Sequence, residues 1–192
     1  EEMEAWEIVD RPDDANIIDS IWAFKIKRFP DGLIKKFKAR FCARGDKQEH
    51  KINFWETWLP VVSWSTILTI MILAAKEGLV SAQYDITAAF VTAPIPENEV
   101  VYVQQPRGFT KTGPNGEPLV CHLNSCLYGM RQSPRYFFKY LTKKFEKAGL
   151  YPSKLDSCLF LGKGAAVITW VDDVLIYGQT EEDITNVIDK LK

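Results

Sequence analysis

The sequence predicts an α+β fold in which a charged β-hairpin precedes a sheet covered by helices. From residue 79 onward, apolar periodicities predict a strand, a short helix, two strands, a helix, a strand hairpin and a final helix. That order is close to a ferredoxin-like β-α-β-β-α-β arrangement with extra edge strands. The 192 residues are 46% hydrophobic and 12% aromatic, which is enough for a sizeable core.

The N-terminal quarter of the chain is strongly polarised in charge. Residues 1–24 hold eight acidic residues and one Arg, whereas residues 25–47 hold nine Lys and Arg residues and two Asp. Charged and apolar residues alternate on both sides of Phe-Pro-Asp-Gly at 29–32, which predicts a β-hairpin. Such a dense basic hairpin favours binding of a polyanion. The alternative is a solvated strand face whose lysines prevent edge pairing.

Capping residues and turn residues mark the other elements. Ser63 or Ser65 can cap an apolar helix that ends before Gly78, and we expect this to be a core helix. A short strand over residues 79–86 then places Asp85 at its end.

Two strands and two helices complete the predicted order. The strands, at residues 100–104 and 119–123, flank a turn-rich stretch. Ser133 as the N-cap and Pro134 as the first helical residue predict a strongly marked helix. Thr180 is the expected cap of a final amphipathic helix.

Two adjacent acidic residues, Asp172 and Asp173, separate the apolar runs 165–171 and 174–177. The runs predict half-buried strands, so this dipeptide would connect them as a tight hairpin. If the strand that ends at Asp85 lies beside the hairpin, three carboxylates meet at one sheet edge, and their repulsion favours a bound cation. Asp is also a common turn residue for backbone reasons, which is the alternative explanation.

Carboxylate oxygens are typical ligands of Mg²⁺ or Mn²⁺ rather than of zinc. Because successive side chains on a strand point to opposite faces, we expect only one of Asp172 and Asp173 to share metal ions with Asp85. The sequence therefore predicts a Mg²⁺ or Mn²⁺ site at this sheet edge.

Composition argues against a membrane protein and against a disulfide scaffold. No uninterrupted apolar stretch approaches the roughly 20 residues of a membrane span, and the N-terminus is acidic where a signal peptide is basic. The four Cys residues are too few and too scattered for a disulfide framework, so we expect them to pack as small hydrophobic residues. These features predict an intracellular protein.

The tetrapeptide Trp-Val-Asp-Asp at residues 170–173 resembles the aromatic-x-Asp-Asp box of reverse transcriptases. Further segments resemble the copia-type (Ty1/copia) retrotransposon polymerases in the same order along the chain, at residues 38–45, 59–67, 84–90, 101–109 and 127–135. Together these segments cover nearly the whole sequence, which is identified as a member of that family. It departs from the family at Trp170, where Tyr is usual.

The resemblance implies an enzyme, the RNA-directed DNA polymerase of an LTR retrotransposon. Asp85 and Asp172 would hold two Mg²⁺ (or Mn²⁺) ions, with Asp173 beside them as the accessory carboxylate. The primer 3′-hydroxyl would then attack a deoxynucleoside triphosphate, and pyrophosphate would leave. The implied partners are this dNTP and an RNA or DNA template with its primer.

The resemblance also implies substrate-binding residues. Phe90 would be the steric gate that leaves no room for a 2′-hydroxyl, although an ordinary core residue is the alternative. The other candidates follow Asp85, lie on the basic hairpin or form the loop that supports the incoming base pair: Ile86, Lys27, Lys38, Arg40, Tyr128, Gly129 and Arg131. The last three could instead be a plain turn before a helix.

In terms of the family, residues 1–78 would be a fingers-like region, and residues 79–192 the polymerase palm, truncated before the thumb. With few phosphate contacts, we expect weak, salt-sensitive primer-template binding and poor extension. The remainder of a polyprotein, with thumb, ribonuclease H and integrase, is an expected partner, in the cytoplasm or in virus-like particles. A domesticated element that only binds nucleic acid is the alternative, and RNA-templated RNA synthesis by a related palm is a third option.

Overall fold

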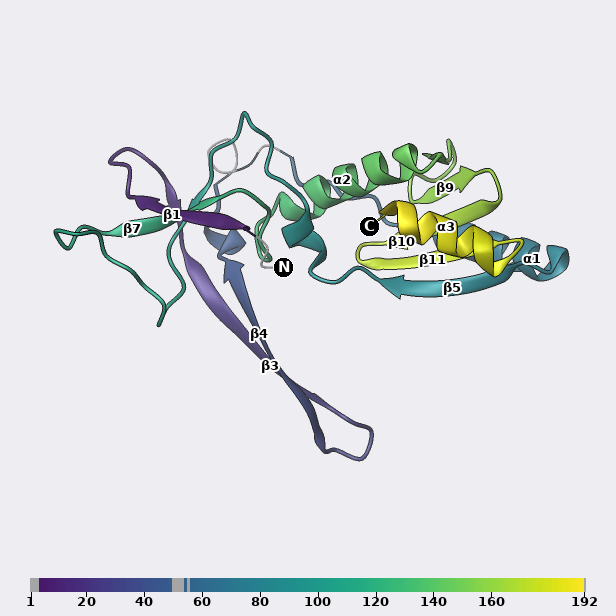
Figure 1. Cartoon of the computed structure of the whole chain (residues 1–192), viewed down its shortest axis with the longest axis horizontal. Coiled ribbons are helices and arrows are strands. Elements are labelled where there is room, and N and C mark those ends of the chain that lie inside the picture. The colour runs from purple at the N-terminus through teal and green to yellow at the C-terminus, as the bar shows by residue number, and fades with distance from the viewer. Residues whose placement is uncertain (1–3, 50–53, 55, 192) are drawn as a thin grey trace. The chain divides into compact units, whose positions relative to one another are not determined.

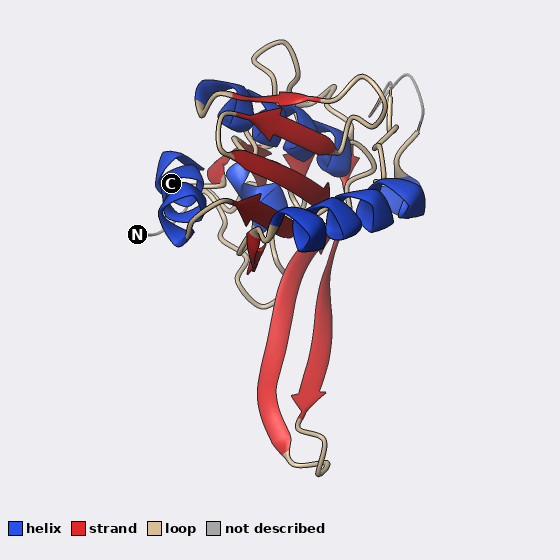
Figure 2. Ribbon diagram, turned by 90° about the vertical axis from the view of Figure 1, so that its right-hand side faces the viewer, coloured by secondary structure: helices blue, strands red, loops and turns tan. Residues whose placement is uncertain are grey.

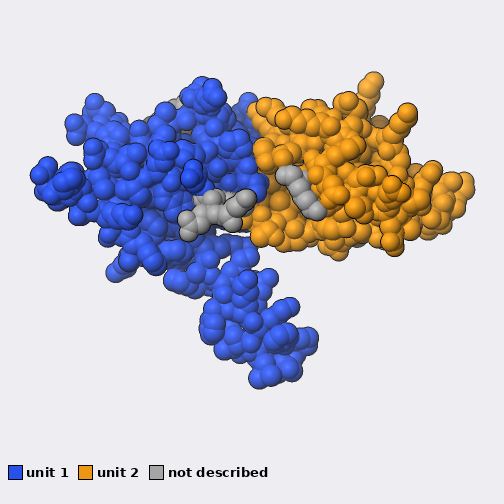
Figure 3. Space-filling view, in the orientation of Figure 1, with its two compact units in different colours: residues 1–57, 90–136 blue, residues 58–89, 137–192 orange. Residues whose placement is uncertain are grey.

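The computed structural model describes residues 4–49, 54 and 56–191, which form two compact units. Each unit combines two stretches of the chain (Figure 3): unit 1 is Glu1–Thr57 with Phe90–Tyr136, and unit 2 is Trp58–Ala89 with Phe137–Lys192. This division differs from the boundary predicted after residue 78, because long-range pairing decides which stretches pack together. Helices and sheets are both present, in agreement with the predicted α+β class.

Unit 1 contains a four-stranded sheet in the order β1-β7-β6-β2, of which Figure 1 labels β1 and β7. Its strands are β1 (Trp6–Asp10), β2 (Ile17–Ile18), β6 (Tyr102–Val103) and β7 (Leu119–Leu123). β6 and β7 confirm the strands predicted at 100–104 and 119–123. The prediction that they share a ferredoxin-like sheet with the strand that ends at Asp85 is wrong, because β7 pairs along its whole length with β1, and β6 lies between β7 and β2.

The predicted basic hairpin is formed by β3 (Ser20–Arg28) and β4 (Ile34–Ala43), and it projects from the rest of unit 1 (Figures 1 and 2). Phe29 N donates a hydrogen bond to Leu33 O at 2.9 Å across the turn. Gly32 has a φ of 87°, a conformation that Gly adopts without steric penalty. The turn lies where the Phe-Pro-Asp-Gly sequence predicts it.

Unit 2 contains a five-stranded antiparallel sheet in the order β5-β11-β10-β9-β8. Its strands are β5 (Val80–Asp85), β8 (Leu150–Pro152), β9 (Leu159–Gly162), β10 (Ala165–Trp170) and β11 (Asp173–Gly178). β5 confirms the predicted strand that ends at Asp85. It pairs with β11, so this strand lies beside the β10-β11 hairpin.

Helices cover both faces of this sheet. On one face, α1 (Trp64–Glu77) packs against a cluster that includes Ile168 of β10. On the opposite face, α3 (Glu181–Leu191) contacts β5, β10 and β11 and places Ile184 beside Gly178. Alternation along the strands separates the two sets of contacts.

The α1 helix begins and ends where predicted, but it is not a core helix. Ser63 caps it through its side chain, and Gly78 follows it in the left-handed conformation. Of its fourteen residues, all of them described, only Ala74 is buried, whereas Trp64 and Ile72 are 71% and 68% exposed. Because the helix is apolar on more than one side, its periodicity does not indicate which side meets the sheet.

The other two helices differ in how their first turns are held. Thr180 Oγ1 accepts a hydrogen bond from Asp183 N at 3.2 Å, and the Asp183 carboxylate accepts one from Thr180 N at 2.9 Å, which confirms the predicted cap of α3. The predicted N-cap role of Ser133 is wrong. Ser133 is the first residue of α2 (Ser133–Lys147), and its buried hydroxyl donates to Leu127 O at 2.7 Å, which satisfies a loop carbonyl instead.

The four Cys residues all lie in the described part of the chain and are free thiols. Burial raises the pKa of Cys121 and Cys158 to about 11 and that of Cys126 to about 12, so these thiols stay uncharged and pack as small hydrophobic residues, as predicted. Within the described residues, no helix has the length and apolar character that crossing a bilayer requires.

Candidate active site

Asp85 and Asp173 lie opposite each other where β5 and β11 pair. Asp85 is the last residue of β5, Asp173 is the first residue of β11, and the antiparallel register makes them direct partners. Directly opposed residues of an antiparallel pair point to the same face of a sheet. The sheet therefore brings together two carboxylates that are far apart in the sequence.

The hairpin turn is shifted by one residue from its predicted position. Trp170 pairs with Asp173, so the two-residue connection is Val171 and Asp172 rather than Asp172 and Asp173. Val171 has a φ of 56°, which a β-branched residue adopts only with strain. A positive φ at the first turn residue is typical of tight hairpin turns that match the strand twist, where Gly is preferred.

Asp172 is tied to the end of β5 through its main chain. Its carbonyl oxygen accepts a hydrogen bond from Ile86 N at 2.9 Å, which holds the turn beside Asp85. Asp173 Oδ1 also accepts a hydrogen bond from Gln83 Nε2 at 3.3 Å. Asp85 and Asp173 are exposed and Asp172 is half-buried, so the three carboxylates are accessible to a ligand.

The three carboxylates have the donor chemistry of a divalent metal site with oxygen ligands. Among the residues that the structure describes, no three acidic, His or Cys side chains gather closely enough to hold a metal ion. The main chain supplies the proximity of the three Asp residues, and side-chain rotation would complete such a site, since exposed side chains change rotamer readily.

One face of the β3-β4 hairpin is basic. Direct partners across two antiparallel strands point to the same face, as do alternate residues along each strand. By this register, the basic face carries Lys25, Lys27, Lys36, Lys38 and Arg40. The opposite face is apolar, with Phe24 77% and Phe37 70% exposed. Lys27, Lys38 and Arg40, the three predicted substrate-binding residues of the basic hairpin, therefore share a face.

Tyr128 contacts two other predicted substrate-binding residues, Phe90 and Arg40, within unit 1. The rings of Phe90 and Tyr128 meet edge to face, with centroids 5.0 Å apart. The Arg40 guanidinium lies 4.9 Å from the centroid of the Tyr128 ring. Phe90 belongs to unit 1, whereas the three Asp residues belong to unit 2.

A family model described as reverse transcriptase (RNA-dependent DNA polymerase) matches residues 3–192. The chain belongs to the reverse transcriptase family. Its curated relatives include the retrovirus-related Pol polyproteins from transposon TNT 1-94 of Nicotiana tabacum, 30% identical over 190 residues, and from transposon RE1 of Arabidopsis thaliana, 31% identical over 192 residues. The Ty1-GR1 Gag-Pol polyprotein of Saccharomyces cerevisiae is 28% identical over 196 residues. These matches confirm the predicted resemblance to copia-type elements.

The relatives of this reverse transcriptase-family chain are much longer than the chain itself. The alignments cover 93%, 97% and 99% of the chain but only 14%, 13% and 10% of the three polyproteins. The chain therefore corresponds to a small part of each Pol polyprotein. Among solved structures, a foamy viral protease-reverse transcriptase in complex with double-stranded DNA matches with a TM-score of 0.42 and 11% identity, covering 96% of this chain and 25% of that one.

Gly129 and Arg131 have packing roles in this reverse transcriptase-family chain. Gly129 has a φ of 88°, and a Cβ atom there would overlap the Ala43 carbonyl oxygen. Arg131 Nε donates to Gly45 O at 2.6 Å, and Arg131 N donates to Gln48 Oε1 at 2.8 Å. Both residues hold their loop against the end of β4, and their binding of substrate stays a prediction.

Three residues that lie beside the candidate residues in the structure are not among the site residues predicted from the sequence. Lys25 and Lys36 share the basic face with Lys27, and the alternation of Lys with apolar residues on both strands was the available signal. The hydrogen bond from Gln83 to Asp173 depends on the pairing of β5 with β11, which leaves no local pattern in the sequence.

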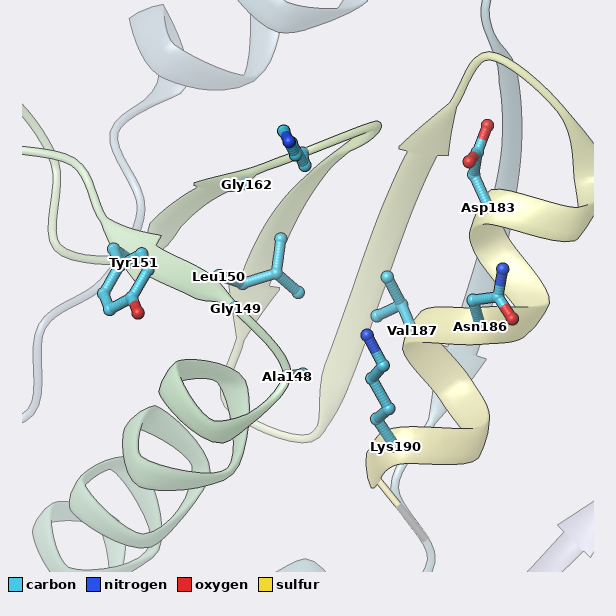
Figure 4. A pocket seen from close by; sticks show the side chains of 10 residues that line it. Ala148, Gly149, Leu150, Tyr151, Gly162, Asp183, Asn186, Val187 and Lys190 are labelled. Atoms are coloured by element: carbon cyan, nitrogen blue, oxygen red, sulfur yellow. The ribbon is translucent and has the colours of Figure 1, made fainter.

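A separate pocket lies at the other end of the unit 2 sheet (Figure 4). Leu150 and Gly162 on the strand side face Val187 and Lys190 of α3 across it. Gly162 pairs with Ala165, which in turn pairs with the last residue of β11, whereas Asp173 is the first. The described residues that line this pocket include no predicted site residue.

Proposed function

We propose that this chain carries the catalytic centre of an RNA-directed DNA polymerase from a retrotransposon Pol polyprotein. The observation that carries the proposal is the opposition of Asp85 and Asp173 across β5 and β11, with Asp172 in the adjoining turn. Membership of the reverse transcriptase family supports it. In this proposal, unit 2 corresponds to the palm and the basic hairpin of unit 1 to the fingers.

The proposed reaction is nucleotidyl transfer from a deoxynucleoside triphosphate to a primer. The primer 3′-oxygen loses its proton and attacks the α-phosphorus, the bond from this phosphorus to the bridging oxygen breaks, and pyrophosphate leaves. Mg²⁺ or Mn²⁺ held by Asp85, Asp172 and Asp173 would stabilise the 3′-alkoxide and the negative charge on the phosphates. The chain itself contributes three carboxylates at one sheet end, two of them fixed on paired strands.

The register favours Asp173 as the carboxylate that acts together with Asp85. Alternation along a strand predicted that only one member of the adjacent pair shares a face with Asp85, and the family resemblance implied that this member is Asp172. The strand pairing supports that argument but points to the other member, since Asp173 is the direct partner of Asp85 and Asp172 lies in the turn.

Substrate binding is proposed for the basic face of the hairpin and for the residues around Phe90. Five cations on one face suit the triphosphate or the template phosphates. Phe90 would act as the steric gate against ribonucleotides, with Tyr128 beside it. An RNA or DNA template with its primer, and the remainder of a Pol polyprotein, are the proposed partners.

Primer extension by the 192-residue chain tests the proposal. With a DNA primer on an RNA template, dNTPs and Mg²⁺, we expect nucleotide addition that EDTA abolishes. The control variant Asp14→Asn, which changes an exposed Asp in unit 1 outside the proposed site, should keep the parental rate. Failure of the parent chain to add any nucleotide with either Mg²⁺ or Mn²⁺ would overturn the proposal.

The basic face also supports a second candidate function, nucleic-acid binding without catalysis. The variant Asp172→Asn separates the two candidates. A polymerase should lose extension but keep its affinity for primer-template, measured by fluorescence anisotropy. If the variant and the parent behave alike in every assay, the binding function is favoured.

A further inference from the structure

Two successive side-chain contacts in unit 1, from Arg40 to Tyr128 and from Tyr128 to Phe90, link the basic hairpin to Phe90. The Arg40 guanidinium lies 4.9 Å from the centroid of the Tyr128 ring, and the Tyr128 ring meets the Phe90 ring edge to face at 5.0 Å and 63°. All three side chains are half-buried. Tyr128 therefore lies between the other two residues, in contact with a cation and with a second aromatic ring.

The main chain of Tyr128 is held against the end of β4. Tyr128 O accepts a hydrogen bond from Ala43 N at 2.8 Å, and Tyr128 forms a parallel bridge with Cys42 at the end of β4. The next residue, Gly129, approaches Ala43 so closely that a Cβ atom would overlap the Ala43 carbonyl oxygen. The strand that anchors the Tyr128 main chain also carries Arg40.

Each contact restricts the orientation of the next ring. A guanidinium over an aromatic face and an edge-to-face pair of rings both have preferred geometries. Removing the Arg40 contact takes away one of the contacts that restrict the Tyr128 ring. Removing the Tyr128 ring takes away a wall against which Phe90 packs.

We propose that Arg40 and Tyr128 are positioning residues that set sugar discrimination through Phe90. This inference rests on the proposed function, in which Phe90 excludes the 2′-hydroxyl of a ribonucleotide. A gate discriminates only while its ring stays in place, so a loosened Phe90 admits the larger sugar. Arg40 and Tyr128 then determine which sugar is accepted without having to touch it.

This role of Arg40 is distinct from charge pairing with a triphosphate. A planar guanidinium can stack through its face while its N–H groups donate in plane, whereas a Lys ammonium offers charge without stacking. Loss of the charge should weaken the binding of dNTPs and rNTPs to the same extent. Loss of the stacking should change the ratio of the kcat/KM values for the two kinds of nucleotide.

The test is single-nucleotide addition by the full chain with Mg²⁺, using a dNTP and the matching rNTP. The measured quantity is the ratio of kcat/KM for the two nucleotides, with kcat and KM recorded separately. The ratio measured for Phe90→Ala, which removes the proposed gate, is the reference value for lost discrimination. We expect Arg40→Lys to lower the ratio by about three- to tenfold, in line with the strength of cation–π and aromatic contacts, mainly through improved rNTP use.

The Tyr128 variants and a matched control complete the design. Tyr128→Ala should lower the ratio towards that of Phe90→Ala, and Tyr128→Phe, which keeps the ring, should retain the parental ratio. Lys35→Ala removes another cation of the hairpin, one that lies 5.5 Å from the Phe29 ring at the turn, and should leave the ratio unchanged. If Tyr128→Ala does not fold, the ratio measured for Arg40→Lys is sufficient to test the positioning role.

The outcomes separate the inference from the proposed function. If the parent adds dNTPs and Phe90→Ala loses discrimination, but Arg40→Lys keeps the parental ratio, the positioning role is overturned and the polymerase proposal stands. An equal loss for dNTPs and rNTPs in Arg40→Lys also overturns it. A parent that adds neither nucleotide refutes the proposed function, and the inference with it.

Discussion

Val171 is strained at the point where the chain turns towards the proposed catalytic carboxylates. Its φ of 56° lies in a region that costs a non-Gly residue about 1–3 kcal/mol. The turn is held on both sides, by the pairing of Trp170 with Asp173 and by the hydrogen bond from Ile86 N to Asp172 O. The fold therefore maintains an unfavourable backbone conformation beside Asp172.

Replacing Val171 with Gly should stabilise the protein. The relief of strain exceeds the entropic cost of a Gly, so we expect the free energy of unfolding to rise by about 1 kcal/mol in urea titrations. Val100→Gly is the matched control, because Val100 is exposed and lies outside the left-handed region, and it should lower that free energy. A decrease of equal size in both variants would show that Val171 is not strained.

At the residue scale, the sequence identified the three Asp residues but not their geometry. Asp172 and Asp173 separate two apolar runs, and Asp85 ends another, so local patterns placed each of them at the end of a strand. Their meeting was predicted only on the condition that these strands lie side by side, which the pairing of β5 with β11 decides. Whether Asp172 or Asp173 opposes Asp85 depends on a shift of one residue in the hairpin. The local pattern allows both registers, because the apolar run before the turn fits either.

At the scale of elements, Asp156 fastens the start of α1 to the loop before β9. Its carboxylate accepts hydrogen bonds from Ser63 N at 2.9 Å, Thr66 Oγ1 at 2.7 Å and Cys158 N at 2.9 Å. Burial raises the pKa of Asp156, but these hydrogen bonds outweigh it and hold the pKa below the usual 3.8. The ionised carboxylate is therefore the form that the fold stabilises.

The contribution of Asp156 should depend on pH. A pKa that is lower in the folded state stabilises the protein above the unfolded-state pKa, near 3.8, and this stabilisation is lost as the pH falls through the folded-state value. Asp156→Asn should lower the free energy of unfolding by about 1 kcal/mol at pH 7, and by less at pH 3. Urea titrations at both pH values measure this, and a deficit that is the same at both would contradict the assignment.

The basic face of the β3-β4 hairpin should dominate nucleic-acid affinity. In the double variant Lys27→Gln/Lys36→Gln, we expect weaker binding of primer-template and a slope of log affinity against log salt that is smaller by about one to two. Fluorescence anisotropy over a range of NaCl concentrations measures both. Lys143→Gln/Lys147→Gln on α2 removes the same charge elsewhere, and an equal effect of this control would mean that total charge, not the hairpin face, binds the nucleic acid.

Most elements could be predicted from periodicity and caps, whereas their partners could not. The hairpin, β5 and α3 carry alternation, end residues or a capping box that act within a few residues. The partner of β7 is β1, whose residues Glu7 and Asp10 give it no clear strand pattern. The predicted positions of the strands are therefore confirmed, whereas their assignment to one sheet is wrong.

At the scale of the whole molecule, each compact unit combines two distant stretches of the chain. Pairings such as Glu7 with His122 create this division, and they depend on contacts that no local composition reveals. The predicted boundary after residue 78 followed the order of elements along the chain. The family, in contrast, could be recognised from the sequence, because its motifs keep their order over nearly the whole chain.

The central claim, that Asp85 and Asp173 act together in nucleotidyl transfer, is tested most directly by single-turnover addition of one dNTP to a primer. Asp85→Asn and Asp173→Asn are compared with the parent and with Asp14→Asn, at matched occupancy of primer-template. The account predicts that each of the first two variants slows addition by about 100-fold or more, since each removes a carboxylate that would hold the metal ions against the negative charge of the transition state, while Asp14→Asn keeps the parental rate. A parental rate in Asp85→Asn or in Asp173→Asn would contradict it.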